Sequence, residues 1–325
     1  MANNTIAQER EFEELVDPYR RELLAHCYRM MGSVHDAEDL VQETYLRAWR
    51  SYGNFEGRSS LRTWLYKIAT NACLTAIEQR GMRPMPTGLG GPTDEPERPL
   101  TATPEVPWLE PVPDGLLGAD PADPASIVAA RESTRLAFVA ALQHLPARQR
   151  VTLILRDVLA WKAAEVAELF GTSTAAVNSA LQRARAQLAE AGPERDHLVE
   201  PTDPEQRDLL ERYAKAFEES DIDGLVELFK QDAVWEMPPF PEWFVGPERI
   251  ARLIRSQCGA GPATFRLRPI GANGQPGYAV YKRAGDGAFR PFQIQVLDIA
   301  RGGIQHASAF FDTRLFAFFG LPEAV

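Results

Sequence analysis

The sequence has few cysteines and no long apolar run. Its three cysteines, Cys27, Cys73 and Cys258, are scattered, with no C-x-x-C pair and no histidine at metal-ligand spacing. This pattern argues against a disulfide framework and a cysteine-based metal site, and we expect neither a metal nor a cofactor. Cys27 and Cys73 fall within helical apolar patterns and are expected in a core. No apolar run approaches the roughly 18 residues that cross a bilayer, so we expect no membrane segment.

Excess positive charge is also missing. The chain of 325 residues has a net charge of -10, whereas affinity for a nucleic-acid backbone comes mainly from Lys and Arg. This balance argues against a protein that holds DNA unaided. The start of the chain, MANNTIAQEREFEEL, is polar and acidic, unlike a secretory signal. A cytoplasmic protein is therefore expected.

Breaks in apolar periodicity divide the chain into four parts. Residues 9–83 and 125–191 carry apolar stripes at helical spacing. Residues 84–124 are rich in Pro and Gly and contain eight acidic residues against one basic residue, which predicts a linker. Residues 205–325 begin with two helical stretches, 205–218 and 222–230, and continue with five strand-like runs between glycine turns. We expect a multidomain protein with two all-α domains and a C-terminal α+β domain.

The predicted linker also carries apolar side chains, concentrated in WLEPVPDGLL. They are either incidental to a tether or they dock on a neighbouring domain. The residues expected to make such a regulatory contact are Trp108, Leu109, Asp114, Leu116 and Leu117.

Residues 162–189, KAAEVAELFGTSTAAVNSALQRARAQLA, predict two helices joined by a tight turn. Gly171 suits the left-handed end of the first helix, and Thr172, Ser173 or Thr174 can cap the second. A second helix with one apolar and one polar face is the helix-turn-helix plan, although an ordinary αα-hairpin has a similar pattern. Just upstream, we expect Arg148, Gln149 and Arg150 of an RQR trio to touch DNA backbone. The other candidate DNA contacts are Thr174, Asn178, Ser179, Gln182, Arg183 and Arg185.

The segment DAEDLVQETYLRAWR (Asp36–Arg50) resembles region 2.2 of extracytoplasmic-function sigma factors of the sigma-70 family. The resemblance implies that Asp36, Asp39 and Glu43, on the helical face opposite the apolar stripe, dock on the clamp helices of the RNA polymerase β′ subunit. The alternative is a solvated acidic face without a partner.

Two further segments extend this resemblance. FEGRSSLRTWLYKIATNA (Phe55–Ala72) resembles regions 2.3 and 2.4, which meet and melt the −10 promoter element. It implies that Arg58, Arg62 and Lys67 face phosphates and that Asn71 lies near the pocket for a flipped base. LQHLPARQRVTLILRDVLAWK resembles the helix before the helix-turn-helix of region 4, which reads the −35 element. Family recognition helices usually read VKSRL, whereas this one reads VNSAL.

Residues 205–325 resemble SnoaL-like polyketide cyclases of the nuclear-transport-factor-like fold, an α+β cone that a minority of these sigma factors carry, mainly in actinobacteria. Candidate residues of a pocket in the cone are Trp235, His306 and Asp312, beside Asp232 and Glu236. A carboxylate in an apolar pocket can have a raised pKa and move protons. A regulatory module without catalysis is the preferred interpretation over a ligand sensor or an enzyme.

The resemblance implies a sigma factor that binds core RNA polymerase and promoter DNA. We expect its C-terminal domain to contact the sigma regions, because tethering raises the effective concentration of even weak contacts. Two alternatives remain: a stand-alone helix-turn-helix regulator, which should bind duplex DNA unaided, and a DNA-binding module fused to a small-molecule enzyme.

Overall fold

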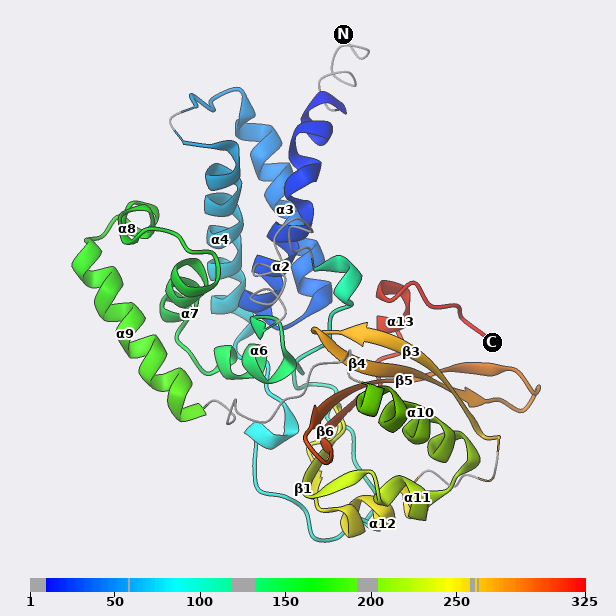
Figure 1. Cartoon of the computed structure of the whole chain (residues 1–325). Coiled ribbons are helices and arrows are strands. Elements are labelled where there is room, and N and C mark those ends of the chain that lie inside the picture. Colours follow the sequence, from blue (N-terminus) through cyan, green and yellow to red (C-terminus); the bar gives the residue numbers. More distant parts are fainter. Residues whose placement is uncertain (1–9, 58, 118–131, 192–203, 258–260, 262) are drawn as a thin grey trace. The chain divides into compact units, whose positions relative to one another are not determined.

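The computed structural model describes residues 10–57, 59–117, 132–191, 204–257, 261 and 263–325 (Figure 1). Within these ranges the chain forms two compact units that do not follow chain order. Unit 1 contains the described residues up to Arg83 and those from Asp114 to Ala191. Unit 2 contains Pro84–Pro113 and the described residues from Pro204 onward. The predicted linker is therefore divided between the two units.

Unit 1 begins with a bundle of long helices that pack against one another, drawn in blue in Figure 1. The first long helix ends at Gly32, which adopts the left-handed conformation with φ 68°. Ser33 and Ser60 then cap the next two helices, accepting hydrogen bonds from the backbone N–H groups of Asp36 and Thr63. The elements are η1 (Asp17–Tyr19), α2 (Arg20–Met31), α3 (Val34–Tyr52) and α4 (Leu61–Arg80).

The second half of unit 1 contains the predicted helix-turn-helix. Its first helix ends at Gly171, with φ 60° and ψ 40°, and Ser173 Oγ accepts from the N–H of Ala176 at the start of the second. Because both signals act locally, the sequence predicted this motif correctly. The elements are η3 (Asp114–Leu116), α6 (Leu136–Gln143), α7 (Ala147–Leu153), the π-helical η4 (Ile154–Val158), α8 (Ala163–Phe170) and α9 (Thr174–Ala191).

Unit 2 is built on one mixed sheet of six strands in the order β2–β1–β6–β5–β4–β3. Neighbouring strands are antiparallel except β1 and β6, which are parallel. The expected α+β class is confirmed, but β2 was not expected from the sequence. The strands are β1 (Phe229–Glu236), β2 (Trp243–Val245), β3 (Phe265–Ala272), β4 (Gln275–Arg283), β5 (Phe289–Ala300) and β6 (Gly303–Phe310).

Helices cover one face of this sheet, and α10 lies across it in Figure 1. The core contains Trp235 and Ala307, which are paired across β1 and β6, together with Tyr213 and Phe217 of α10. Alternate residues of a strand point to opposite faces, so the side chains of Glu236 and His306 lie on the other face. The helices are α10 (Pro204–Glu219), α11 (Ile222–Val226), α12 (Pro247–Gln257) and α13 (Leu315–Phe318).

Two expectations for unit 2 were wrong in detail. The helix predicted over residues 222–230 ends at Val226, because Phe229 already begins β1. The helix α12 was missed. Its apolar positions Ile250, Leu253 and Ile254 recur at helical spacing and are buried, and Pro247 occupies the first helical position, where proline is favoured. These signals were present in the sequence.

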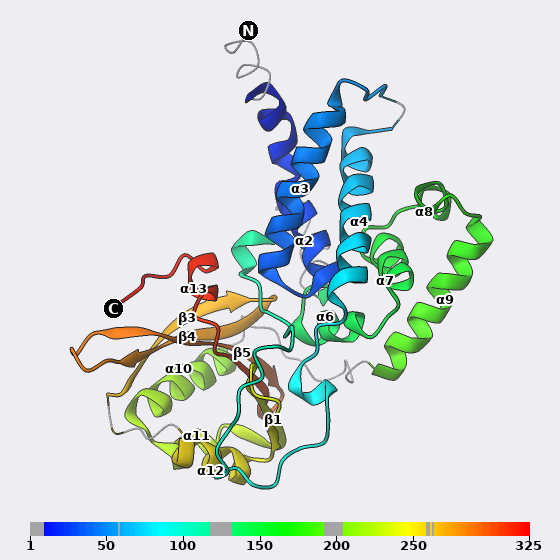
Figure 2. The ribbon, with the colours of Figure 1, turned by 180° about the vertical axis from the view of Figure 1, so that it is seen from behind.

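Residues Pro84–Pro113, which we call the strap, are an ordered part of unit 2 and run along it, as Figure 2 shows from behind. One short helix, η2 (Pro86–Gly88), interrupts the strap. Composition suggested that this stretch would not order itself. It is ordered because the C-terminal domain supplies the apolar surface and hydrogen-bond partners that the strap lacks on its own.

Candidate functional site

The acidic residues of α3 do not all lie on an exposed face. Asp39 is exposed, and Glu43 is half-buried and pairs with Arg47 one turn later at 2.6 Å. Asp36 is buried, and its carboxylate is paired with both Arg80 and Arg83. Asp36 therefore ties the start of α3 to the end of α4, and only Asp39 and Glu43 of the predicted set present their carboxylates toward solvent.

The residues predicted to meet the −10 element lie along α4. Lys67 and Asn71 are exposed and one turn apart. Arg62 is half-buried and already paired, since its guanidinium donates to the Glu22 carboxylate at 2.8 and 3.0 Å and lies over the Tyr66 ring at 5.0 Å from its centroid. Burial opposes the charge of Arg62, but the bonds to Glu22 outweigh it, so the pKa of Arg62 is raised. Arg58 lies outside the described residues.

A chain of aromatic rings was not singled out from the sequence. The Phe55 ring lies 4.8 Å from that of Trp64 and 6.5 Å from that of Tyr52, between their centroids. Trp64 is half-buried, so part of its ring remains accessible. Aromatic faces near a basic surface are the usual platform for unpaired bases. The three residues come from two helices and the loop between them. Helical spacing in the sequence therefore could not predict that their rings lie close together.

The predicted −35 contacts gather on the exposed side of α9. The exposed residues of α9 include Thr174, Asn178, Ser179, Gln182 and Arg183. Arg148 of α7 is also exposed. Asn178, Gln182 and Arg185 line a shallow groove with Arg156 of η4. Arg185 also makes a bidentate pair with Asp157 at 2.6 and 2.8 Å, and this carboxylate raises the pKa of Arg185. The guanidinium of Arg185 is therefore already paired within the protein.

Arg150, which was expected to touch DNA backbone, has a buried side chain instead of an exposed one. Its guanidinium donates to the backbone oxygens of Met30, at the end of α2, and of Gln143 and Leu145. Burial lowers the pKa of Arg150 to about 10, which leaves it charged near neutral pH. It thus connects the helix-turn-helix half of unit 1 to the first bundle.

A second buried arginine, in the first bundle, bonds to the helix-turn-helix half of unit 1. Arg29 of α2 donates to the backbone and side-chain oxygens of Ser133 at 3.2 and 2.9 Å. The Tyr66 ring also meets the Trp161 ring edge-on, with 5.7 Å between centroids. Unpaired buried polar groups cost roughly 1–3 kcal/mol each, so these contacts stabilise one arrangement of the two halves of unit 1.

Trp108 and Leu109, the first two residues of WLEPVPDGLL, are buried in the strap part of unit 2. Trp108 is 8% exposed and Leu109 is fully buried. Pro113 forms an isolated β-bridge with Ala272 at the end of β3. The end of the motif belongs to unit 1. There Asp114 and Leu116 are the first and last residues of η3, which contacts α2, and the next residue, Leu117, is half-buried.

Ion pairs and hydrogen bonds hold the middle of the strap along the domain. Glu97 makes a bidentate pair with Arg252 of α12 at 2.6 and 2.8 Å. The Pro96 oxygen accepts from Ser256 Oγ, and the Arg98 oxygen accepts from Gln257 Nε2. The acidity of the predicted linker is thus partly neutralised by α12.

Of the residues predicted to share a pocket in unit 2, Trp235, His306 and Asp312 do not come together, whereas His306 and Glu236 do. Trp235 is buried in the core, whereas His306 lies on the opposite face of the sheet. Asp312 is occupied by a bidentate contact with Arg314. None of these three lines the small pocket of unit 2, which is bordered by other residues.

His306 instead joins a buried polar cluster with Glu236. Its Nε2 lies 2.7 Å from Glu236 Oε1, which also accepts from Ser308 Oγ at 3.2 Å, while Glu236 Oε2 accepts from the backbone N–H of Thr87 in the strap. Burial disfavours both charges, but their mutual attraction outweighs it, so the pKa of His306 is raised and that of Glu236 is lowered. The cluster anchors the beginning of the strap.

Three segments of the chain match known protein families. Residues 15–82 match the family described as sigma-70 region 2, and residues 135–188 match sigma-70, region 4. Residues 210–303 match the SnoaL-like domain. The chain is also 59% identical over 317 residues to the ECF RNA polymerase sigma factor SigG of Mycobacterium tuberculosis, covering 97% of this chain and 85% of that protein.

The chain belongs to the extracytoplasmic-function sigma factors.

A second relative of this sigma factor also matches most of the chain. SigJ of M. tuberculosis is 33% identical over 277 residues, covering 82% of this chain and 79% of SigJ. The crystal structure of SigJ superposes with a TM-score of 0.60 over 95% of this chain and 99% of that one, at 24% identity, which shows a shared fold. In the described part of this sigma factor, every helix is too short or too polar to cross a bilayer.

Proposed function

We propose that this sigma factor acts in the cytoplasm by binding core RNA polymerase through α3 and directing it to promoters through α4 and α9. The observation that carries the proposal is that this chain matches both sigma regions and is 59% identical to the sigma factor SigG over 97% of its length. The solvent-facing carboxylates of Asp39 and Glu43 on α3 and the polar face of α9 support it. A net charge of -10 fits a protein that needs the polymerase for its hold on DNA.

Co-purification with core polymerase, followed by run-off transcription, tests this function. We expect the chain to co-elute with core enzyme and to start transcripts at a defined promoter. Binding of promoter duplex in a gel shift without polymerase, with no stimulation by it, would instead favour a stand-alone regulator.

We further propose distinct roles for the exposed residues of the two DNA-facing helices. On α4, Lys67 contacts phosphate and Asn71 pairs with the edge of an unstacked −10 base, with the nearby rings of Phe55 and Trp64 available for stacking. On α9, an amide such as Asn178 can read a base edge. Arg183 is exposed and suited to phosphate.

We also propose that the C-terminal domain is a regulatory module without catalytic activity, and that it acts through the strap. The strap is the covalent path from region 2 toward region 4, yet it is built into the C-terminal domain. Releasing its thirty residues would add up to roughly 100 Å of extended chain between the regions. Retention of the strap therefore limits how far the two sigma regions can separate.

Releasing the strap in the full chain tests this regulation. Leu109→Asp places a charge at a fully buried strap position, whereas Ala102→Asp places it at an exposed one. We expect Leu109→Asp to make the strap sensitive to protease and to raise run-off transcription, with Ala102→Asp unchanged in both. A released strap with wild-type transcription would refute the regulatory role.

A further inference from the structure

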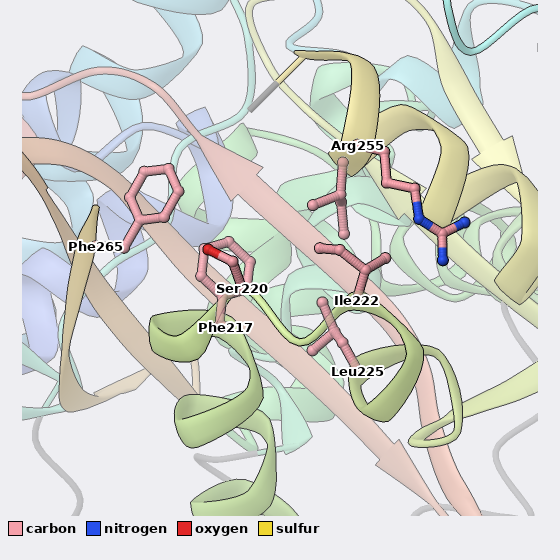
Figure 3. A pocket seen from close by; sticks show the side chains of 7 residues that line it. Phe217, Ser220, Ile222, Leu225, Arg255 and Phe265 are labelled. Atoms are coloured by element: carbon pink, nitrogen blue, oxygen red, sulfur yellow. The ribbon is translucent and has the colours of Figure 1, made fainter. Parts of the chain in front are cut away.

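Unit 2 contains a small apolar pocket at the corner where α10 gives way to α11. Its cavity volume is about 140 Å³. Its walls come from four elements, because α10, α11, α12 and β3 each contribute one or two apolar side chains. Figure 3 shows the side chains around this space, with the Arg255 guanidinium pointing away from it. The apolar lining residues are Phe217, Ile222, Leu225, Ile254 and Phe265.

The polar groups at the rim are already engaged. Ser220 Oγ donates to the Gly261 oxygen at 3.1 Å, and Arg255 forms an ion pair with Asp223. An apolar cavity of about 150 Å³ lined by Leu, Ile and Phe in another protein accepts benzene, and this pocket, which is partly open to solvent, has a similar volume and lining. Size and lining thus match one small hydrocarbon ring.

The last turn of α12 lies between this pocket and the strap. Ile254 and Arg255 border the pocket. The adjoining residues Ser256 and Gln257 donate to strap oxygens, and Arg252 pairs with Glu97. A shift of this turn caused by an occupant of the pocket would therefore change the geometry of the strap contacts directly.

We propose that the pocket is a binding site for a small, uncharged, largely apolar molecule of the size of one aromatic ring, and that its occupancy tightens the hold of α12 on the strap. The second half of the proposal rests on the regulatory role proposed for the strap. The binding half stands on the pocket alone. A filled cavity restores the dispersion contacts that its lining lacks, which stabilises the ordered form of α11 and the end of α12.

Toluene is a suitable probe for the full-length protein. With methyl-labelled protein, we expect saturable shifts of the Ile222, Leu225 and Ile254 methyl resonances and nuclear Overhauser effects between toluene and the Leu225 methyls. Ile304, in the core but outside the lining, should not shift. Absence of both signals in the wild-type protein overturns the binding site, and this result needs no variant.

A matched pair of variants locates the binding. Ile222→Trp fills the pocket, whereas Val226→Trp adds the same bulk to the same helix at a position that does not line it. We expect Ile222→Trp to weaken toluene binding about tenfold or more, equivalent to about 1.4 kcal/mol, and Val226→Trp to leave it unchanged. Equal binding in both variants would mean that toluene binds elsewhere.

Hydrogen exchange in the strap tests the coupling. We expect saturating toluene to slow exchange over residues 93–103 in the wild type and to leave it unchanged in Ile222→Trp. Pocket binding with unaltered strap exchange would refute the coupling but keep the site. Because transcription by Leu109→Asp is measured without toluene, failure of the regulatory role is distinguished from failure of the binding site.

Discussion

Val112 and Asn273 are joined by two hydrogen bonds: the Val112 N–H donates to Asn273 Oδ1 and the Asn273 N–H donates to the Val112 oxygen, both at 2.9 Å. Both residues are fully buried. Asn273 has φ 58° in the turn between β3 and β4, a conformation that asparagine tolerates better than most residues. One side chain therefore both shapes a turn of the C-terminal domain and fixes the end of the strap.

Replacing Asn273 should loosen this end of the strap. Asn273→Gly keeps the turn conformation but removes the acceptor, leaving the Val112 N–H unpaired, and we expect a loss of roughly 1–3 kcal/mol. Asn273→Ala adds backbone strain of roughly 1–2 kcal/mol. Urea unfolding of both variants, with amide exchange of Val112, measures the two effects. Val112 exchange that stays at the wild-type rate in Asn273→Gly would contradict this account of the strap anchor.

Arg148 and Arg150 are two residues apart and should behave differently. Arg150→Met leaves the oxygens of Met30, Gln143 and Leu145 without a donor, so we expect a destabilisation of about 3 kcal/mol. Arg148→Met changes an exposed side chain and should alter stability by no more than about 0.5 kcal/mol, while weakening promoter binding by the polymerase complex. Chemical denaturation measures the stability of each variant, and filter binding measures its hold on promoter DNA. Weaker promoter binding by Arg150→Met with unchanged stability would show that Arg150 contacts DNA.

The Glu236–His306 pair should make stability depend on pH. The raised pKa of His306 means that its contribution is present below the unfolded value of 6.5 and is lost as pH rises through the folded value. The lowered pKa of Glu236 means that its contribution is present above 4.5 and is lost as pH falls. Asp298 also faces His306 and adds to its raised pKa. The pair is therefore most stabilising between pH 4.5 and 6.5.

His306→Gln provides the measurement for this pair. The stability difference between wild type and His306→Gln should be largest near pH 6 and should shrink toward pH 9, in thermal or urea unfolding. His306→Gln keeps a donor for Glu236, so the variant should fold. A difference that is constant across this range would show that protonation of His306 contributes nothing.

The two kinds of DNA contact proposed on α9 should be separable by salt and sequence. Arg183→Ala should weaken binding of the polymerase complex to all promoters alike and reduce the salt slope by about 1. Asn178→Ala should lose about 1–3 kcal/mol of discrimination at one −35 position. Fluorescence anisotropy with −35 variants at several salt concentrations measures both. Equal losses on every sequence in Asn178→Ala would contradict direct base reading.

Local signals explain what the sequence predicted well. The end of α8 at Gly171 and the cap at Ser173 depend on residues within one turn. The burial of Asp36 could not be predicted in this way, because its partners Arg80 and Arg83 follow 44 and 47 residues later. The order of the strap was missed for the same reason: its partners lie more than a hundred residues further along the chain.

The most direct test of this account is charge reversal on α3 at Asp39 and Glu43, the two predicted acidic residues whose carboxylates face solvent. Asp39→Lys with Glu43→Lys leaves Asp36 and its two arginine partners in place, so the bundle should keep its stability. The matched control reverses Glu13, an exposed acidic residue of the same unit but outside α3. The account predicts that the double variant folds normally and loses binding to core RNA polymerase, while Glu13→Lys keeps it. Undiminished binding by the folded double variant would contradict the proposed role of α3.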